Sequence, residues 1–335
     1  MEVILLIPLL ASFFITFLVL PIWIKKTKKI GLVWEDMNKY KREKISGSGG
    51  VIVILGFVLA VLSYVALKTF YFKSPEKIVE IFSLLTSILI LAGIGIIDDL
   101  MGWHHGGLSK KSRLILCFFA AIPLMVINAG NNIINMPFIG RVNLGLIYPL
   151  FLIPLGIVAT STTFNFLAGF NGLEAGQGIL IIGSLGIISY LTGSSWLSLI
   201  SLCMVLVLVA FLIFNFYPAK VFPGDVLTYP VGGLIAIMAI LGNFERIAVF
   251  FFIPYILEVI LKLRGRLKKQ SFGKPNKDNS LDLAYKKVYS LNHIAILILK
   301  KLKGRAYEKE AVYLIWTFQL IIILLGFLIF RNSLF

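Results

Sequence analysis

Residues 78–99 read IVEIFSLLTSILILAGIGIIDD. Glu80 is the only charged side chain before the stretch ends in the adjacent carboxylates Asp98 and Asp99. The hydrocarbon core of a bilayer requires about 20 mostly apolar residues per helix, so the stretch predicts a membrane-spanning helix over 78–97. Whether this helix is an isolated anchor or one of many depends on how often such runs recur along the chain.

Apolar runs of this kind recur from one end of the chain to the other. The 335 residues are 59% hydrophobic and 14% charged, and their mean hydropathy is +0.93. Soluble domains carry about 25% charged residues, so this composition excludes that class. We therefore predict an all-α polytopic membrane protein with about ten transmembrane helices. The expected spans are 3–24, 48–70, 78–97, 113–129, 146–164, 175–193, 196–216, 226–242, 246–263 and 311–331.

The sequence indicates one integral membrane domain over residues 1–335, without an internal repeat or a low-complexity segment. Met1 and Glu2 precede an apolar run that extends to about Ile24, which favours a first transmembrane helix over a cleaved signal. Cys117 and Cys203 both fall inside apolar runs. Two such thiols are typical of packing residues, and they indicate neither a disulfide framework nor a zinc site.

The basic residues predict the orientation. The chain has 32 Lys and Arg against 16 Asp and Glu, a net charge of +16. Ten spans place both termini on one side, and 26 of the 32 basic residues lie in or beside the loops of the other side. Lys and Arg gather in cytoplasmic loops, so we expect both termini outside and no nucleic-acid partner. The expected cytoplasmic loops are 25–47, 98–112, 165–174, 217–225 and 264–310.

The last of these loops contains a short apolar segment. Residues 291–305 read LNHIAILILKKLKGR, which is too short to cross a bilayer and ends in four cations. Such a segment is expected to lie along the lipid headgroups, where anionic lipid favours it.

Polar motifs of unusual composition occur in the expected cytoplasmic loops. Asp98 and Asp99 form an ordinary interfacial stop or, alternatively, serve a divalent cation or a proton transfer. The segment NFLAGFNGLEAGQG at 165–178 is either a Gly-rich turn or a loop that approaches a ligand closely. VFPGD at 221–225 adds Asp225, which is also a candidate helix N-cap.

The first loop adds two further segments. WEDMNK at 34–39 is polar, and SGSGG at 46–50 leads into a helix. Successive backbone N–H groups at 46–50 are able to bind phosphate, but a small-residue stretch that eases the start of a helix explains them equally well.

The conjunction of these motifs on one basic face favours a catalytic site. Carboxylates with amides suggest magnesium, Gly-rich backbone suggests phosphate, and the surrounding cations suit a polyanionic substrate. A soluble nucleotide and a lipid phosphate both reach a site at the membrane surface. Two other classes remain in view: a transporter of phosphorylated solutes, which binds near the bilayer midplane, and a scaffold that has lost catalysis.

The motifs together resemble a known family. IDDL at 97–100, NFLAGFNGLEAGQG, VFPGD and DMNK at 36–39 are similar in order and spacing to the polyprenyl-phosphate N-acetylhexosamine-1-phosphate transferases. The eukaryotic and archaeal branch, which uses UDP-GlcNAc and dolichyl phosphate, is the more similar. The resemblance covers about residues 30–290 and includes the ten-span plan.

The resemblance implies roles for individual residues. Asp98 and Asp99 match the catalytic pair, one of which orients or deprotonates the lipid phosphate. Asn165 and Asp225 match the ligands of Mg²⁺, with Mn²⁺ as the alternative ion. Arg113 falls where the family has a phosphate-binding Lys. Lys111 is the alternative, because this loop is two residues longer. Phe166 is assigned with them to the lipid-phosphate and diphosphate contacts. The nucleotide-sugar contacts are Glu35, Asp36, Met37, Asn38, Asn171, Glu174 and Phe222, with Phe222 stacking on uracil.

The sequence departs from the family in the last loop. Lys269, Gln270 and Ser271 stand where the eukaryotic branch has an Arg- and His-rich sugar-binding stretch. These three residues are the expected sugar contacts, and the identity of the N-acetylhexosamine stays open. The bacterial peptidoglycan relative has a His cluster here, whereas this loop has only His293, which disfavours a MurNAc-pentapeptide substrate.

The expected reaction transfers GlcNAc-1-phosphate from UDP-GlcNAc to dolichyl phosphate and releases UMP, the first membrane step of a lipid-linked glycan pathway. Phosphoryl transfer depends mainly on positioning and charge neutralisation. We favour direct displacement over a covalent phospho-enzyme. The sequence leaves the alternatives of another UDP-N-acetylhexosamine and of a homodimer open, together with the lipid chain length.

Overall fold

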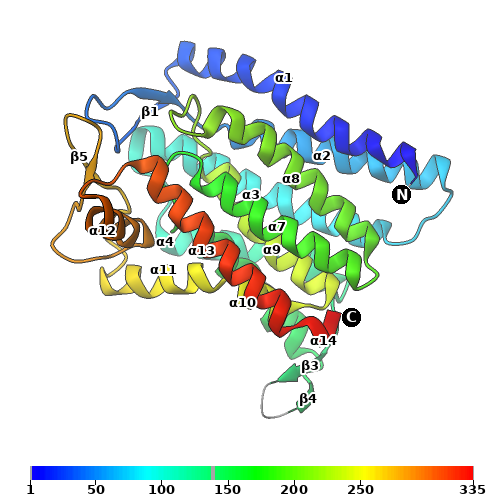
Figure 1. Cartoon of the computed structure of the whole chain (residues 1–335). Helices are drawn as coiled ribbons and strands as arrows, with labels where there is room; N and C mark the ends of the chain where they lie inside the picture. The colour runs from blue at the N-terminus through cyan, green and yellow to red at the C-terminus, as the bar shows by residue number, and fades with distance from the viewer. Residues whose placement is uncertain (1, 137–139, 335) are drawn as a thin grey trace.

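The computed structural model describes residues 2–136 and 140–334 as helices that run between two ends of the molecule (Figure 1). The helical elements are η1 (Val3–Leu5), α1 (Leu6–Ile30), α2 (Gly50–Ala66), η2 (Leu67–Tyr71), α3 (Ile78–His105), α4 (Lys110–Phe119), α5 (Ile122–Val126), η3 (Tyr148–Leu152), α6 (Ile153–Phe164), α7 (Leu173–Leu191), α8 (Ser195–Asn215), α9 (Asp225–Gly242), α10 (Glu245–Phe251), α11 (Ile253–Arg264), α12 (Leu291–Lys303), α13 (Glu308–Ile329) and α14 (Arg331–Leu334).

The strands form three small antiparallel hairpins. They are β1 (Val33–Glu35) with β2 (Lys44–Ser46), β3 (Ile133–Met136) with β4 (Gly140–Asn143), and β5 (Lys274–Pro275) with β6 (Leu281–Asp282). Each hairpin lies in a connection between helices, so none contributes to the helical core. The first and the third belong to the loops in which the polar motifs fall.

Seven helices in the described part of the chain are long and apolar enough to cross a membrane. They are Val3–Ile30, Gly50–Tyr71, Ile78–Trp103, Leu173–Leu191, Ser195–Asn215, Asp225–Gly242 and Glu308–Ile329. The prediction of an all-α polytopic membrane protein is confirmed, and the chain is an integral membrane protein. Seven of the ten expected spans therefore correspond to single long helices.

The other three expected spans are shorter or divided helices. The run 113–129 is divided between α4 and α5, 246–263 is divided between α10 and α11, and 146–164 forms the 17-residue helix Tyr148–Phe164. Each run contains proline, which has no N–H to donate and is favoured in the first turn of a helix. Pro123, Pro154 and Pro254 accordingly lie in the first turns of α5, α6 and α11.

The two ends of the molecule differ in what they carry. Both chain termini lie at one end, and β1, β5 and α12 lie at the other (Figure 1). The second end is called here the loop end; it is formed by the connections 31–49, 106–109, 165–172, 216–224 and 265–307. The five loops that were expected to share one face therefore meet at one end of the helices.

The end of α3 corrects one expectation. The first carboxylate pair was expected to follow the helix, but α3 continues through Asp98 and Asp99 to His105. The polypeptide turns only at Gly106, which has φ +83°. The apolar run ends earlier than the helix because only the part inside the hydrocarbon layer has to be apolar. The connection to α4 is thus 106–109 rather than 98–112.

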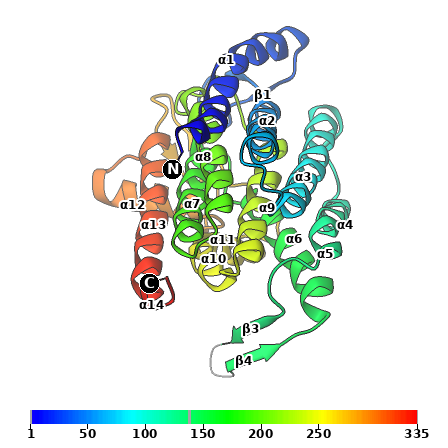
Figure 2. The ribbon, with the colours of Figure 1, turned by 90° about the vertical axis from the view of Figure 1, so that its right-hand side faces the viewer.

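Close contact between α3 and α9 determines where the acids lie. A Cβ built on Gly95 would meet the main-chain carbonyl carbon of Asp225 at 2.5 Å and the Cα of Val226 at 2.5 Å. The backbones therefore touch without an intervening side chain. α9 lies inside the bundle (Figure 2) and buries nearly all of its length. The start of α9 is thus held directly against the last turns of α3.

This contact predicts different outcomes for two glycines of one helix. Gly95→Ala should lower the thermal stability of the detergent-solubilised protein, because overpacking at a rigid backbone contact costs about 1–3 kcal/mol. Gly93→Ala is the matched control, since its Cβ would meet no described atom within 4 Å and alanine favours the helix. Thermal unfolding of both variants checks this expectation, and equal melting temperatures would contradict it.

Candidate active site

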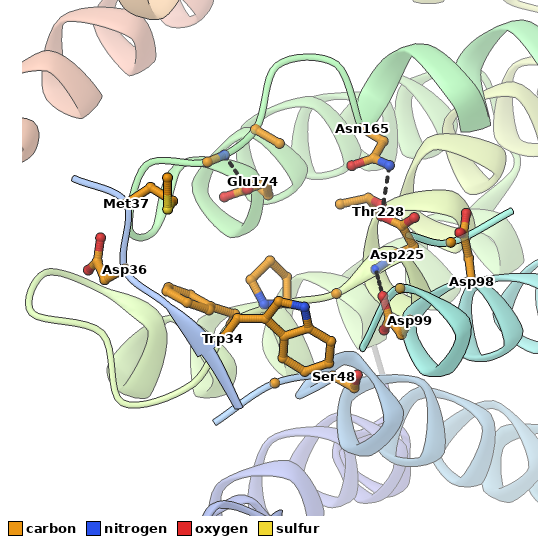
Figure 3. A pocket seen from close by; sticks show the side chains of 18 of the residues that line it. Trp34, Asp36, Met37, Ser48, Asp98, Asp99, Asn165, Glu174, Asp225 and Thr228 are labelled. Atoms are coloured by element: carbon orange, nitrogen blue, oxygen red, sulfur yellow. Dashed lines mark hydrogen bonds between the residues drawn. The ribbon is translucent and has the colours of Figure 1, made fainter. Parts of the chain in front are cut away.

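A cavity of about 580 Å³ opens at the loop end between α3, α7 and α9 (Figure 3). Its walls come from the first loop, the end of α3, the loop before α7 and the loop before α9. Eleven of the seventeen expected site residues line it: Glu35, Asp36, Met37, Asp98, Asp99, Arg113, Asn165, Asn171, Glu174, Phe222 and Asp225. Three loops and the end of one helix, all distant in the sequence, therefore form one cavity.

The acidic end of the cavity is formed by α3, α6 and α9. The Asn165 Nδ2 donates to Asp225 Oδ1 at 2.7 Å, and the backbone N–H of Asp225 donates to Asp99 Oδ1 at 2.7 Å. Figure 3 shows Asn165, Asp225, Asp98 and Asp99 gathered at this end. The alternative reading of Asp225 as an N-cap is wrong, because it is the first residue of α9 and Gly224 occupies the cap position.

The two adjacent aspartates have different surroundings. The Arg113 guanidinium contacts both oxygens of Asp98: Nη2 donates to Oδ1 at 3.0 Å, and Nε lies 2.7 Å from Oδ2. The Tyr229 hydroxyl and the Leu108 N–H also donate to Asp98, at 2.8 Å and 2.7 Å. In contrast, Asp99 Oδ2 is buried without a hydrogen-bond partner in the described part of the chain. Asp98 is therefore fully used in holding structure, whereas one oxygen of Asp99 has no partner among the described residues.

The opposite end of the cavity is formed by the first loop. Asp36 and Met37 lie there in Figure 3, on the far side of the cavity from Asp98 and Asp225, and Trp34 lies between the two ends. The Trp34 ring lies against Gly47, because a Cβ on this glycine would meet ring atoms at 1.7 Å and 2.1 Å. An aromatic wall and backbone from 34–37 are suited to a flat, polar-edged group such as a nucleobase. This end is called here the loop-1 end.

Two expected contact residues instead hold the cavity wall. Asn38 is buried, where its Nδ2 donates to the Gly169 carbonyl at 2.6 Å and its Oδ1 accepts from the Gly273 N–H at 3.1 Å. Glu174 is also buried, and its Oε1 accepts from the Gly169 N–H at 2.8 Å. Both side chains therefore fix the backbone around Gly169, which has φ +99°. Glu174 still borders the cavity, whereas Asn38 lies behind its wall.

The glycine stretch that leads into α2 uses most of its N–H groups within the fold. The N–H of Gly49 donates to the Phe222 carbonyl at 2.9 Å, and that of Gly50 donates to the Pro223 carbonyl at 2.9 Å. A Cβ on Gly50 would also meet the backbone of Leu227 at 2.6 Å. The N–H groups of Gly47, Gly49 and Gly50 are thus not available to a phosphate. The glycines allow α2 to pack closely against the loop before α9.

A second cavity, of about 760 Å³, adjoins the first. The two cavities share Arg113, Asn165, Ala168, Gly169, Asp225 and Phe272 in their walls. The second cavity brings in Phe166, Lys269, Gln270 and Ser271, so these four expected residues lie beside the acidic end rather than in the first cavity. Lys110 and Lys268 add positive charge to its wall, and Leu114 adds apolar surface. Lys111 is exposed and contributes to neither set of described lining residues.

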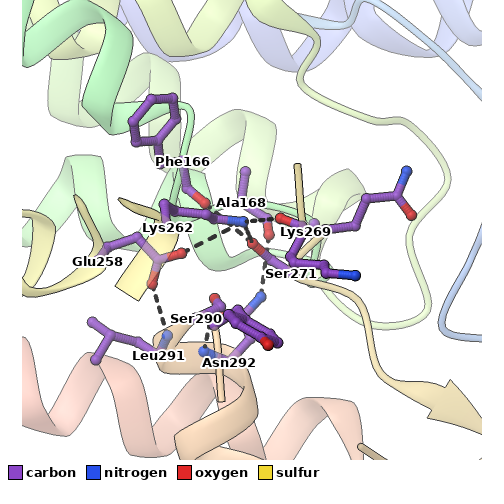
Figure 4. A network of polar contacts seen from close by, with 12 residues as sticks. Phe166, Ala168, Glu258, Lys262, Lys269, Ser271, Ser290, Leu291 and Asn292 are labelled. Carbon is purple, nitrogen blue, oxygen red and sulfur yellow. Dashed lines mark hydrogen bonds and ion pairs between the residues drawn. The ribbon is translucent and has the colours of Figure 1, made fainter. Parts of the chain in front are cut away.

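A buried lysine organises the wall of the second cavity (Figure 4). The Lys262 Nζ donates to the Lys269 carbonyl at 3.1 Å and to the Ser271 hydroxyl at 2.5 Å, and it lies 3.7 Å from Glu258 Oε1. Ser271 in turn donates to the Phe166 carbonyl at 3.2 Å. The Lys262 ammonium therefore joins the last loop to the loop before α7.

His293 lies behind this wall, where it contacts the backbone of Phe272. Its ring lies between the Phe272 carbonyl, at 3.2 Å from Nε2, and the Tyr289 N–H, at 3.2 Å from Nδ1. Burial lowers the pKa of His293 below its ordinary value of 6.5. A neutral imidazole at neutral pH is consistent with a role in packing this loop.

The Lys262 contacts predict that its removal loosens the loop. In Lys262→Met the loop around Lys268 and Lys269 should be cleaved by trypsin about ten-fold faster, because lost hydrogen bonds to a charged group amount to about 1.5–3 kcal/mol. Lys301→Met on the exposed side of α12 is the matched control and should cleave at the wild-type rate. Limited proteolysis with mass spectrometry identifies the sites. An unchanged cleavage rate in Lys262→Met would contradict this role.

The donors at the acidic end fit a magnesium ion that is shared with a substrate. In the described residues no cluster of three or more His, Cys, Asp or Glu side chains forms a metal site. Asn165 and Asp225 instead offer one amide and one carboxylate side by side, and Asp225 faces the cavity with a side chain that is 20% exposed. Mg²⁺ is commonly held by one or two carboxylates together with substrate phosphates and water.

Several lining residues were not anticipated from the sequence. Trp34, Ser48, Thr228 and Phe272 line the first cavity, and Tyr229 holds Asp98 from α9. Thr228 and Tyr229 are three and four residues after Asp225, so helix periodicity places them on the same face as that acid. This spacing was a usable signal. Phe272 had none, because its position depends on how the last loop folds back.

The chain is similar in sequence to known proteins. Residues 81–243 match the model of a family described as glycosyl transferase family 4. A Saccharolobus solfataricus protein, provisionally named UDP-N-acetylglucosamine–dolichyl-phosphate N-acetylglucosaminephosphotransferase, is 36% identical over 94% of this chain and 94% of its own length. A Dictyostelium discoideum protein of that name is 31% identical over 73% of this chain and 68% of its own length.

A bacterial relative is more distant. The phospho-N-acetylmuramoyl-pentapeptide-transferase of Halalkalibacterium halodurans is 27% identical over 78% of this chain and 82% of its own length. Similarity to the Saccharolobus protein, in contrast, extends over nearly the whole molecule. The chain belongs to glycosyl transferase family 4 and, within it, to the group of membrane enzymes that transfer a phosphosugar.

Proposed function

We propose that this chain transfers GlcNAc-1-phosphate from UDP-GlcNAc to dolichyl or another polyprenyl phosphate. One observation carries the proposal: Asp98, Asp99, Asn165 and Asp225 line a single cavity at the loop end, where it meets a second cavity. The names of the Saccharolobus and Dictyostelium relatives support the choice of substrates. A donor and an acceptor would meet at the wall that the two cavities share.

The first cavity suits the nucleotide diphosphate. Uridine would occupy the loop-1 end, between Trp34, Phe222 and the backbone of 35–37, and the diphosphate would extend toward Asn165 and Asp225. The lining of this cavity, as described, contains six carboxylates and one guanidinium, that of Arg113. A diphosphate cannot enter so acidic a site without a cation, because like charges repel strongly in a partly buried site. This imbalance supports a bound divalent ion.

Asn165 and Asp225 would hold Mg²⁺, with Mn²⁺ as the alternative. When bound, the ion would neutralise charge on the diphosphate and on the departing UMP. Arg113 is placed to assist, since its guanidinium lies 3.9 Å from Asp225 Oδ2 while it holds Asp98. Asp225 would therefore face a metal on one side and an arginine on the other.

The second cavity suits the lipid phosphate. Lys110, Lys268 and Lys269 give it positive charge, and Leu114 with Phe166 gives it an apolar side. A phosphate headgroup on a hydrocarbon chain requires both kinds of surface. The acceptor oxygen would attack the β-phosphorus of UDP-GlcNAc while the bond from that phosphorus to the UMP oxygen breaks. UMP leaves as a phosphate monoester, and GlcNAc-diphosphate-lipid remains.

Asp99 is the member of the carboxylate pair that we assign to the acceptor. It lines the first cavity beside the N-terminus of α9, whose first residue, Asp225, borders both cavities. Its Oδ2 lies buried against Gly224 without a hydrogen-bond partner in the described part of the chain. A lipid phosphate is already largely ionised near pH 7, since the second phosphate pKa is about 6. Strong base catalysis is therefore not required of Asp99, and direct displacement needs no covalent enzyme intermediate.

The loop end would face the cytoplasm, with both termini outside. Of the 32 basic residues, 26 lie in or beside the loops of this end. The positive-inside rule orients such a protein with these loops in the cytosol, where UDP-sugars are made. α12 also lies at this end, with Lys300, Lys301 and Lys303 in its last turn, as expected of a helix among anionic headgroups.

The test is release of UMP by purified protein given UDP-GlcNAc, Mg²⁺ and dolichyl phosphate. UMP should form only when all three are present, and UDP-GalNAc assayed in parallel reports whether another N-acetylhexosamine is preferred. Exchange of labelled UMP into UDP-GlcNAc without lipid phosphate should not occur under direct displacement. Uptake of UDP-GlcNAc into liposomes without UMP release would instead indicate the transporter class and overturn the proposal.

A further inference from the structure

A buried pair of opposite charges lies behind the loop-1 end of the first cavity. Glu308 is the first residue of α13 and is 1% exposed, and its carboxylate pairs with the ammonium of Lys39. Removing two charges from water costs several kcal/mol per ion, so a buried pair is weak support for stability alone. The surroundings of this pair indicate a further role.

Glu308 and Lys39 connect four separate segments. Glu308 Oε1 accepts from the backbone N–H of Asn171 at 2.7 Å and from Asn38 Nδ2 at 3.4 Å. Lys39 Nζ lies 3.6 Å from Asp36 Oδ2 and 3.9 Å from the centre of the Tyr217 ring. The last transmembrane helix, the first loop, the loop before α7 and the loop before α9 are thus joined at two side chains.

The connection continues to the cavity surface. Asn171 Nδ2 donates to Asp36 Oδ2 at 3.1 Å, and both residues border the cavity at the end where a uridine would lie. The Asp36 Oδ1 also accepts from the Asn38 N–H at 3.0 Å. These polar groups of the wall are held, directly or through one neighbour, by the pair behind it. The pair is therefore in a position to control the shape of the nucleoside site without contact with its ligand.

We propose that Glu308 and Lys39 are positioning residues for the nucleoside end of the donor site. This inference rests on the proposed function, because it takes the first cavity as the UDP-sugar site. Glu308 fixes the Asn171 backbone, and Lys39 fixes the Asp36 carboxylate to which the Asn171 amide is bonded. Because Asp225 and Asp99 lie at the other end of the cavity, loss of the pair should weaken donor binding and leave the chemical step intact.

The test is a kinetic comparison of Glu308→Gln with wild type. Glutamine preserves the shape and an acceptor for the Asn171 N–H but removes the charge opposite Lys39. The KM for UDP-GlcNAc should rise about ten-fold, an effect typical of residues that hold a ligand-contacting side chain in place. The kcat and the KM for dolichyl phosphate should stay within about two-fold of wild type. Glu310→Gln is the matched control, because Glu310 lies in the same turn of α13 and pairs with Lys303 at the surface. It should behave as wild type.

A binding measurement without lipid gives an independent result. The dissociation constant for UDP with Mg²⁺ should rise by the same factor in Glu308→Gln and in Lys39→Gln, and the double variant should be little worse than either single variant, since the two residues act as a unit. If Glu308→Gln fails to fold, Lys39→Gln gives the same readout. A fall in kcat and melting temperature at unchanged KM and UDP affinity would overturn the inference. Absence of UMP release from wild type would instead overturn the proposed function.

Discussion

Asp225→Ala should abolish transfer while the protein still folds. The variant loses the carboxylate that faces both Asn165 and the Arg113 guanidinium, so it should fail to hold Mg²⁺ on the diphosphate. Loss of a group that stabilises developing charge in such a site lowers kcat by about 100–1000-fold. The fold should survive, because α9 is joined to α3 through the backbone of residue 225. Its N–H bond to Asp99 and its contact with Gly95 do not need the side chain.

UMP release, thermal unfolding and Mg²⁺ dependence measured on one preparation check this expectation. Asp278→Asn is the control, because Asp278 pairs with Arg305 on the exposed surface of the last loop. It should retain wild-type activity. A folded Asp225→Ala protein that releases UMP at the wild-type rate would show that the metal is held elsewhere.

Asp98→Asn and Asp99→Asn should both lose activity, but only Asp98→Asn should also lose stability. The amide introduced by Asp99→Asn keeps an oxygen to accept from the Asp225 N–H, so this variant should fold normally and lose about 100-fold or more in kcat. The Asp98→Asn change leaves the Arg113 guanidinium without its closer counter-charge, in a site where the aspartate is 1% exposed. Breaking a buried pair costs about 3 kcal/mol or more. Asp98→Asn should therefore melt at a clearly lower temperature as well as lose activity.

The two effects are separated by measuring kcat and melting temperature for both variants. Tyr229→Phe is an informative companion, since it removes one of the donors to Asp98 and keeps the charges. It should lower the melting temperature moderately and leave kcat near wild type. An Asp98→Asn protein as stable as wild type but less active than Asp99→Asn would reverse the assignment of the two roles.

The residues that could be placed from sequence are those in segments of distinctive composition, either long apolar runs or unusual polar motifs. Apolar length and proline content explain both the spans that were found and the three that are shorter or divided, since Pro123, Pro154 and Pro254 lie where helices begin again. Asp98, Asp99, Asn165 and Asp225 could be assigned to one face because the basic residues determined the side of every loop. The cavity they share confirms that they meet.

What could not be predicted depends on contacts between distant segments. Asn38 stands in a motif that resembles a ligand-binding one, yet its amide is used by Gly169 and Gly273, which are remote in sequence. The end of α3 was placed too early because hydropathy reports the edge of the lipid and not the end of the hydrogen-bonded helix. The partners of Glu308 lie in other loops of the chain, so no pattern within α13 could have revealed them.

The contact between Gly95 and the main chain of Asp225 has a consequence for how far the sequence is free to diverge. Where two helices touch through side chains, a substitution on one helix shifts the other helix. The distance between groups on the two helices then changes. Here the spacing between the α3 and α9 carboxylates is set by two polypeptide backbones, so lipid-facing residues can be exchanged freely without altering it. Most of the mutations that a membrane protein accumulates therefore leave the distance between these carboxylates unchanged.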